Sequence, residues 1–427
     1  MQQVCIKCRK SAGDKFQTFC ECGGFTEMEY DLTKVKLHDS PNPYVRFADL
    51  LPVKNLPARL PRDSRYTPVV HAKKLGNLLG MPLLYLKDET VLPTRSTKDR
   101  MAFVSLAYLW EHGVRSFCIS STGNSSTAYT NAIRLYPDMR VFVFTAESFI
   151  GRVQHAEHDQ VRHFGLRNAS FVEASEAAAA YAKAHGHTSE TGFFNLGRRE
   201  GLKIAFLEAA EQIPQPIDWY VQAVSSAMGV YGTYKGAKEL LGLRRIDRLP
   251  KLIGVQQENC SPMVRAYHEG SETIQPHHIV PHPRGIADAI LRGNPTKVYP
   301  YIRQIVIESG GTFVAVSEDD IREARRMVEE LEGLSPCFSA STAMAGLIKQ
   351  VRNKSFPVKE TVFVNLTGGE RTGEPAPKKI TWMQRGQNGW REEKLPRPRP
   401  ISANRMGAAC IARNQGLDGW YAYGQKQ

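Results

Sequence analysis

The chain has no uninterrupted apolar run of about 18 residues, which excludes a membrane-spanning helix of ordinary length. The first residues, Met1–Cys5, lack the charged and apolar regions of a secretory signal peptide. No internal repeat is visible, so a solenoid or propeller is not indicated. We therefore expect a cytoplasmic globular protein with no membrane partner.

The chain has few acidic residues relative to basic ones. Its 43 Asp and Glu residues and 56 Lys and Arg residues give a net charge of +13. Such an excess favours anionic ligands and raises the question of nucleic acid. Residues 378–427 contain ten basic and three acidic residues, so this segment contributes much of the excess. Its basic residues are scattered among Pro, Gly and Asn, which favours a solvated basic extension over a nucleic-acid-binding arm.

Four of the eight cysteines form two close pairs near the N-terminus, with the spacing C-x2-C-x11-C-x-C: Cys5, Cys8, Cys20 and Cys22. Two such pairs joined by a loop can place four thiolates around one tetrahedral Zn²⁺ ion. A reduced chain uses such pairs for metal more often than for disulfides. Because all four ligands are cysteine, no position stays open for water, and we expect a structural zinc site.

The 427 residues exceed one average domain and divide into four segments. We expect a zinc ribbon over 1–30, a Pro-rich wrapping linker over 31–62, a core over 63–377 and the basic extension over 378–427. Within the core, short apolar runs alternate with helical patterns, which predicts an α/β fold with parallel sheets covered on both faces.

The predicted strands are the short apolar runs of the core, at 83–87, 117–119, 140–144, 169–172, 219–224, 252–255 and 361–366. The predicted helices are its longer periodic segments, at 102–111, 127–135, 176–184, 202–211 and 319–331.

Lys98 lies in the run Leu-Pro-Thr-Arg-Ser-Thr-Lys-Asp-Arg of residues 92–100, about twenty residues before the small polar turn Ser-Ser-Thr-Gly-Asn-Ser-Ser of 120–126. A strand, a tight turn and a helix start present backbone N–H groups to an anion. Three further motifs follow in order, Asn-Leu-Gly-Arg-Arg-Glu-Gly-Leu-Lys at 195–203, Gly-Ile-Ala-Asp-Ala-Ile at 285–290 with Gly-Asn-Pro at 293–295, and Thr-Gly-Gly at 367–369. Each is weak alone.

Together, these five motifs resemble threonine synthase and its fold-type II pyridoxal-phosphate relatives, over roughly residues 60–375. The resemblance implies two α/β lobes with pyridoxal 5'-phosphate between them, and a smaller lobe inserted at about 100–200. It also implies a homodimer, and it agrees with a zinc ribbon before the catalytic domain.

By this resemblance, Lys98 is the catalytic lysine that binds the cofactor covalently and later acts as a base. Asn124 matches the residue that hydrogen-bonds the phenolic oxygen of the cofactor, and Thr367 the one that faces its pyridine nitrogen. The phosphate is expected after the strand ending at Val224, at Ser225, Ser226, Ala227, Met228 and Gly229. Relatives have a more glycine-rich loop there.

Ser121, Thr122 and Ser125 match positions that hold the substrate carboxylate. Arg95 stands where relatives have a glycine-like residue, so its guanidinium either contacts the leaving group of the substrate or lies on the surface. We expect Asp99 and Arg100 to form a structural ion pair beneath the site, and Glu200 and Lys203 to pair along one helix.

The function implied is replacement or elimination at the β- or γ-carbon of a small, O-phosphorylated amino acid, as in the conversion of O-phosphohomoserine to threonine. A β-replacement on O-phosphoserine in a specialised pathway is the alternative reaction. A cofactor- or nucleic-acid-binding protein without catalysis is the alternative of another class.

Overall fold

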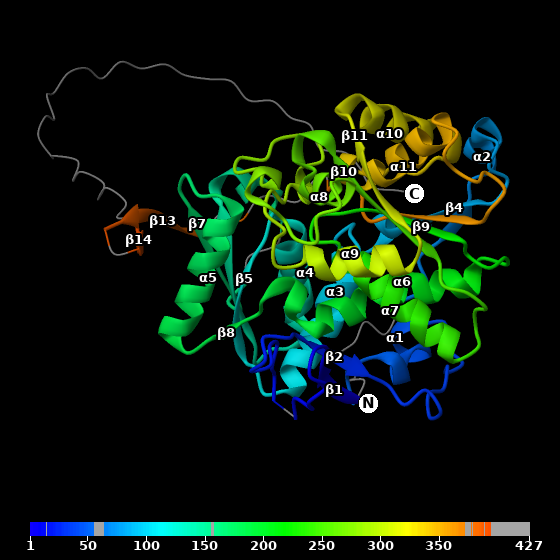
Figure 1. Ribbon diagram of the computed structural model, residues 1–427. Helices are drawn as coiled ribbons and strands as arrows, with labels where there is room; N and C mark the ends of the chain where they lie inside the picture. Colours follow the sequence, from blue (N-terminus) through cyan, green and yellow to red (C-terminus); the bar gives the residue numbers. More distant parts are fainter. Residues whose placement is uncertain are drawn as a thin grey trace, which may run out of the picture. The chain divides into compact units, whose positions relative to one another are not determined.

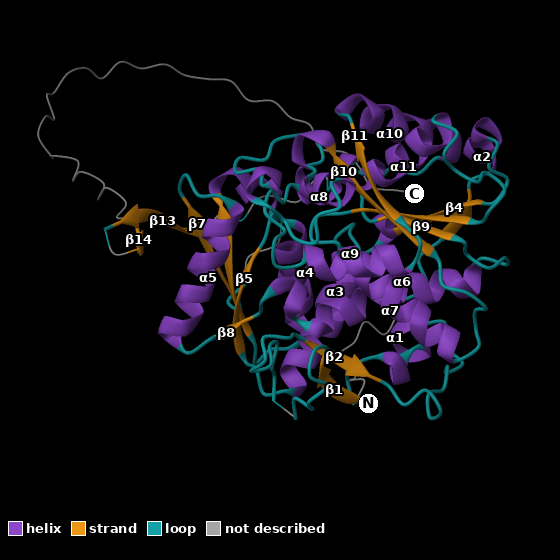
Figure 2. Cartoon of the chain, in the orientation of Figure 1, coloured by secondary structure: helices purple, strands orange, loops and turns teal. Residues whose placement is uncertain are grey.

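The computed structural model describes residues 1–13, 15–54, 64–154, 158–371, 377, 379–387 and 389–393. Part of the predicted linker and most of the predicted basic extension, with Cys410, lie outside the described residues. Two six-stranded sheets with flanking helices form the framework of the described chain (Figures 1 and 2).

The first sheet has the strand order β11-β10-β9-β12-β4-β3. All neighbouring strands in it are parallel except β3 and β4, which run antiparallel. Most of its strands are buried apolar runs, as parallel strands covered on both faces must be. Its members are β3 (Val69–His71), β4 (Leu84–Asp88), β9 (Trp219–Ala223), β10 (Lys251–Gln257), β11 (Thr312–Val316) and β12 (Val362–Leu366).

The second sheet has the order β14-β13-β7-β6-β5-β8 and combines two distant parts of the sequence. Strand β13 pairs in parallel with β7, and a Cβ at Gly165 of β7 would lie 2.8 Å from the Trp382 ring, so the close pairing requires glycine. Its members are β5 (Ser116–Ser120), β6 (Arg140–Ala146), β7 (Val161–Leu166), β8 (Thr188–Ser189), β13 (Ile380–Gly386) and β14 (Gly389–Glu392).

The chain completes β3 and β4 of the first sheet, forms β5 to β8 of the second, and then returns to the first sheet for β9 to β12. The predicted α/β architecture with mainly parallel sheets is confirmed. Strands β13 and β14 fall within the segment predicted as the basic extension, and they belong to the second sheet.

Helices cover both faces of the first sheet: α3, α6 and α7 pack together on one face, and α10 and α11 on the other (Figure 1). The helices are α1 (Pro43–Arg46), α2 (Lys73–Leu79), α3 (Lys98–Glu111), α4 (Asn124–Ala132), α5 (Phe171–His185), α6 (Leu196–Gln212), α7 (Met228–Gly242), α8 (Pro262–His268), α9 (Tyr299–Glu308), α10 (Glu318–Glu332) and α11 (Phe338–Arg352). Short 3-10 helices are η1 (Ala48–Leu50), η2 (Glu89–Val91), η3 (Ile133–Leu135), η4 (Glu147–Arg152), η5 (Gly192–Phe194), η6 (Glu258–Cys260), η7 (Pro276–His278) and η8 (Asp288–Ile290). None of the helices in the described ranges has the length and apolarity needed to span a bilayer.

The N-terminal hairpin of β1 (Gln2–Cys5) and β2 (Thr26–Glu29) packs against the helices of the core. The Tyr108 hydroxyl donates to Gln3 Oε1 at 2.6 Å, and Arg199 donates to the Thr26 carbonyl at 2.5 Å. Phe25 is fully buried, and the Arg199 guanidinium lies 4.6 Å from its ring centre. The hairpin is therefore part of the same core as the helices that it contacts.

The strand predicted at 169–172 is wrong, because α5 begins at Phe171. The side chain of Ser170 accepts a hydrogen bond from the Glu173 N–H, and the Glu173 carboxylate accepts one from the Ser170 N–H. This reciprocal capping box stabilises a helix start, and the apolar residues after Ser170 belong to the first turn. The prediction also missed four strands of the core, β3, β7, β8 and β11. In β7 a His and an Arg interrupt the apolar pattern.

The cap of α5 gives a direct test of this assignment. We expect Ser170→Ala to lower the free energy of unfolding by about 1 kcal/mol, because the backbone N–H of Glu173 loses its acceptor. Ser175→Ala is the matched control, since Ser175 is exposed inside the same helix and should be neutral or slightly stabilising. Urea unfolding measures both, and equal effects of the two substitutions would contradict the assignment.

Candidate active site

A cavity of about 140 Å³ lies where α3, α4 and α7 begin, beyond the carboxyl ends of strands from both sheets. This is the usual ligand position in parallel α/β folds. All residues predicted to hold the cofactor line it, as do three of the four predicted to hold substrate: Lys98, Ser121, Thr122, Asn124, Ser125, Ser225, Ser226, Ala227, Met228, Gly229 and Thr367. Lys98 and Thr367, which are 269 positions apart in the sequence, thus line the same cavity.

Lys98 is the first residue of α3 and lines the cavity. The loop before it is fixed to the end of β12, since the Thr97 N–H donates to the Thr367 carbonyl at 2.9 Å. Burial, and then the positive charge of Arg198, lowers the pKa of the Lys98 amine to about 8. A far larger fraction of this amine than of an ordinary lysine is therefore neutral and nucleophilic near neutral pH.

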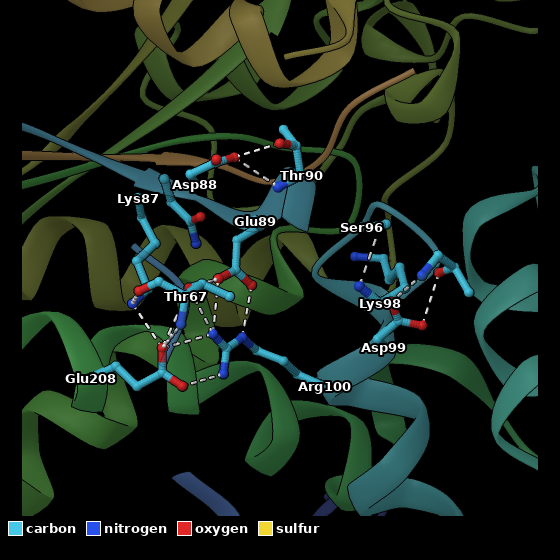
Figure 3. Close-up of polar contacts among 12 residues, drawn as sticks. Thr67, Lys87, Asp88, Glu89, Thr90, Ser96, Lys98, Asp99, Arg100 and Glu208 are labelled. Atoms are coloured by element: carbon cyan, nitrogen blue, oxygen red, sulfur yellow. Dashed lines mark hydrogen bonds and ion pairs between the residues drawn. The ribbon is translucent and has the colours of Figure 1, made fainter. Parts of the chain in front are cut away.

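A buried ion network holds the start of α3 (Figure 3). Arg100 donates to Glu89 through Nε at 2.8 Å and to Glu208 through Nη1 at 2.6 Å, and Lys87 Nζ donates to Glu208 at 2.7 Å. These four charged side chains are almost fully buried, and Thr67 completes the network. Removing one partner from such a network costs about 3–5 kcal/mol, because the other charge stays buried without compensation.

The predicted ion pair between Asp99 and Arg100 is wrong. Successive helix residues point in different directions, so Arg100 reaches the network while Asp99 lies beside Lys98 (Figure 3). The Asp99 carboxylate accepts hydrogen bonds from the Thr94 N–H at 2.7 Å and the Thr94 hydroxyl at 2.8 Å. Burial raises the pKa of Asp99 to about 7. Asp99 therefore fixes the loop that leads to Lys98.

The turn before α4 approaches a neighbouring loop too closely for any side chain at Gly123. Its φ is 121°, and a Cβ there would lie 2.7 Å from the carbonyl oxygen of Arg152. Ser121 Oγ accepts hydrogen bonds from the N–H groups of Gly123 at 3.0 Å and Ser126 at 3.1 Å. This hydroxyl shapes the turn, while Thr122 and Ser125 also face the cavity.

The start of α7 fits a phosphate group. Ala227 has a left-handed backbone with φ 55°, and no side chain caps the first turn of this fifteen-residue helix. The uncapped N–H groups border the same cavity as Lys98. Small residues and a helix N-terminus attract a dianion. An amine that can bind an aldehyde, and a phosphate cradle across the same cavity, match the two ends of pyridoxal phosphate.

Sequence reasoning missed three arginines in and beside the cavity. None of them belongs to a motif, although Arg292 lies between the motif at 285–290 and Gly-Asn-Pro at 293–295. Arg292 lines it and lies over the Phe171 ring at 5.7 Å. Arg152 and Arg371 lie next to it, in an adjoining cavity of about 370 Å³. Arg198, within a predicted motif, lines the main cavity, but its charge is neutralised by Glu190.

Arg95 is the predicted substrate residue that the structure does not bring into the cavity. Its φ is 54°, and its carbonyl accepts a hydrogen bond from the Gly369 N–H at 2.9 Å. Its Nη2 lies so close to Gly369 that a Cβ there would be 2.7 Å away. The guanidinium thus packs against the loop after β12. The predicted pair of Glu200 and Lys203 is confirmed within α6.

The four N-terminal cysteines converge, with all sulfur atoms within 4.8 Å of one another. Cys5 Sγ lies 3.4 Å from Cys22 Sγ, and Cys8 Sγ lies 3.5 Å from Cys20 Sγ. These separations are close to those of four thiolates around one tetrahedral ion with bonds of about 2.3 Å. The donor set therefore fits the predicted metal.

A second group of possible ligands, Glu269 with His277 and His278, is arranged as a hydrogen-bond network. His278 Nδ1 accepts from the Gln275 N–H at 2.9 Å, so the proton of the neutral ring is on Nε2, which donates to Glu269 at 2.7 Å. A metal on Nε2 would need the opposite tautomer. These residues therefore form a hydrogen-bonded polar loop.

The comparisons with known proteins agree with this geometry. The family model of the pyridoxal-phosphate dependent enzymes matches residues 61–368. The chain belongs to this family. Pyridoxal phosphate is thus its cofactor, and the resemblance drawn from the five motifs is confirmed.

Two groups of relatives of this pyridoxal-phosphate dependent enzyme have different names. A threonine synthase of Methanocaldococcus jannaschii is 29% identical over 381 residues, covering 86% of this chain and 92% of the relative. A cysteate synthase of Methanocella paludicola is 27% identical over 384 residues, covering 86% and 88%. The relatives are therefore amino-acid synthases.

Solved structures share the fold at lower identity. Maize serine racemase superposes with a TM-score of 0.60 at 18% identity, covering 72% of this chain and 89% of the racemase. Processed threonine deaminase isoform 2 of Solanum lycopersicum gives a TM-score of 0.58 at 18% identity, covering 72% and 84%. The two-sheet architecture is thus that of fold-type II enzymes.

The lowered pKa of Lys98 predicts how cofactor capture depends on pH. When pyridoxal phosphate is added to cofactor-free protein, we expect the rate of appearance of the visible absorption band to rise with a midpoint near pH 8. The neutral amine attacks the aldehyde, and its fraction increases as pH rises through the pKa.

Borohydride reduction followed by peptide mapping should then find the modification at residue 98, and Lys98→Ala should abolish it. Modification at another lysine in fully loaded protein would contradict the assignment of Lys98.

Proposed function

We propose that this enzyme catalyses replacement or elimination at the β- or γ-carbon of a small amino acid whose side chain carries an anionic, O-phosphorylated leaving group. The observation that carries the proposal is the environment of Arg292. Among the described residues, Arg292 forms no ion pair, and its Nε lacks a hydrogen-bond acceptor. Burial lowers the pKa of Arg292 to about 10, so it remains charged at neutral pH.

An uncompensated guanidinium in a cavity wall is unfavourable unless a ligand supplies the counter-charge. The other cations that face this cavity have different assignments: Arg198 is neutralised by Glu190, and Lys98 is the cofactor lysine. Arg292 is therefore the cation that binds the anionic group on the side chain of the substrate. A phosphate ester fits, because guanidinium forms paired hydrogen bonds with phosphate oxygens.

Pyridoxal phosphate supplies an electron sink for negative charge at Cα when it is bound. In the proposed reaction, Lys98 Nζ removes the α-proton of the substrate and returns it at the end. Ser121, Thr122 and Ser125 hold the substrate carboxylate at the start of α4. The hydroxyl of Thr367 serves as a neutral partner for the ring nitrogen, and Asn124 donates to the phenolic oxygen.

Two reactions of this class agree with the relatives. In the first, O-phosphohomoserine and water give threonine and inorganic phosphate. In the second, a nucleophile replaces the phosphate of O-phosphoserine, and the names of the cysteate synthase relatives support this alternative. Both release inorganic phosphate, and both require a cation beside the leaving group.

Phosphate release from the purified holoenzyme tests the proposal and separates its two forms. We expect release from O-phosphohomoserine alone if the threonine synthase reaction is correct, and from O-phosphoserine with an added nucleophile if the alternative is. Arg292→Gln should raise KM for the phosphorylated substrate about tenfold to a hundredfold, as loss of a charge-assisted contact predicts.

Arg284→Gln is the matched control, because Arg284 is exposed in the same connecting segment and does not line the cavity. Release from neither substrate, or an equal change of KM in both variants, would contradict the proposal.

We also infer that Cys5, Cys8, Cys20 and Cys22 hold a structural zinc ion. The convergence of four sulfur atoms supports this inference, and it leaves no ligand position for catalytic water. The ion would close the loop between β1 and β2, which brings Phe25 into the core beside α6.

Metal analysis tests the zinc site. We expect purified protein to contain about one zinc ion per chain and Cys8→Ser to lose it, with a fall in Tm, because ion binding is coupled to folding of the hairpin. Cys118→Ser, which alters a cysteine in β5, should retain the metal whatever its effect on Tm. Full zinc content in Cys8→Ser would contradict the four-cysteine site.

A further inference from the structure

Three arginine contacts join the two sheets beside the catalytic cavity. Arg371 follows β12 of the first sheet, whereas Asn124, Arg152 and Gln154 follow β5 and β6 of the second. Arg371 donates through Nη1 to Asn124 Oδ1 at 2.7 Å, through Nη2 to the Arg152 carbonyl at 2.7 Å, and through Nε to Gln154 Oε1 at 3.1 Å. Arg371 thus contacts three groups of the other sheet's loops.

A second arginine, Arg152, also joins the loops of the two sheets beside the cavity. Arg152, from the second sheet's loops, forms an ion pair with Asp288 of η8, which lies in the connection between β10 and β11 of the first sheet. Arg152 Nη2 also donates to Asn124 Oδ1 at 3.3 Å. The Asn124 side chain is therefore bonded by two guanidinium groups, one from each sheet's loops.

These hydrogen bonds fix the orientation of the Asn124 side-chain amide. A guanidinium only donates hydrogen bonds, so the Asn124 atom that meets Arg152 and Arg371 must be the oxygen. Asn124 lines both the catalytic cavity and the adjoining cavity that contains Arg371. With Oδ1 held on the outer side, Nδ2 is the atom left for the catalytic cavity, and no acceptor for it is found in the described ranges.

We propose that Arg371 is a positioning residue that turns the amide donor of Asn124 toward the phenolic oxygen of the cofactor. This inference rests on the proposed role of Asn124. Without Arg371, the amide can rotate and present its oxygen to an anionic oxygen, which is repulsive.

The visible spectrum of the substrate-free holoenzyme tests the proposal. A hydrogen bond to the deprotonated phenolic oxygen favours that form, so its loss raises the pKa of the spectral transition. We expect Arg371→Met to raise the midpoint by about one pH unit, which corresponds to one hydrogen bond. Asn124→Ala should raise it at least as much.

The double variant distinguishes positioning from a general structural effect. If Arg371 acts through Asn124, Arg371→Met should shift the midpoint no further in an Asn124→Ala background. Arg371→Lys, which keeps the charge but not the planar fork, should give a smaller shift that also disappears in that background. If Arg371→Met fails to fold, Arg371→Lys can replace it in the comparison with and without Asn124.

Arg325→Gln is the matched control. Arg325 donates to Glu370, the residue before Arg371, at 3.0 Å, and none of its contacts in the described part of the chain involves Asn124. Its midpoint should stay at the wild-type value. An unchanged midpoint in Arg371→Met, or an equal shift with and without Asn124, would overturn the proposal. Since no substrate is used, absence of phosphate release would contradict only the proposed reaction.

Discussion

The active site depends on the buried ion network around Arg100. This guanidinium lies two residues after Lys98, and Glu89 and Glu208 hold it from a segment after β4 and from α6. Because the network is almost fully buried, each charge is stable only while its partners stay in place. The start of α3 is therefore fixed relative to the first sheet, and with it the direction in which Lys98 enters the cavity.

The cations that line the cavity are of two kinds, those with a carboxylate partner and those without one. Arg198 has a carboxylate partner, Glu190, although its charge still contributes to the lowered pKa of Lys98. Lys98 and Arg292 are largely uncompensated, and burial lowers the pKa of each. For the lysine this produces a nucleophile, and for the arginine, which stays protonated, it produces a demand for an anionic ligand. Burial thus makes Lys98 partly neutral but leaves Arg292 charged, because the ordinary pKa of arginine is higher than that of lysine.

Three of the motifs, the Lys98 block, the turn at 120–126 and Thr-Gly-Gly at 367–369, come after strands whose apolar runs are visible in the sequence. Lys98, Asn124 and Thr367 all line one cavity. Two local interpretations failed for identifiable reasons. The strand at 169–172 overlooked the capping box of Ser170 and Glu173, which is a sequence signal. The pairing of Asp99 with Arg100 ignored that neighbouring helix residues point apart.

Arg152, Arg292 and Arg371 could not be predicted, because an arginine carries no local sign of its distant partner. The contact of Arg371 with Asn124 spans 247 positions in the sequence and depends on how two sheets are packed. Likewise, β13 pairs with β7 in the second sheet, and its Trp382 packs on Gly165, far earlier in the chain.

The sequence by itself determined the α/β class, the pyridoxal-phosphate family and the cysteine cluster, because apolar periodicity, motif order and close cysteine spacing are local. The tertiary structure decided which cations are neutralised and which face the cavity, because long-range packing alone places a counter-charge.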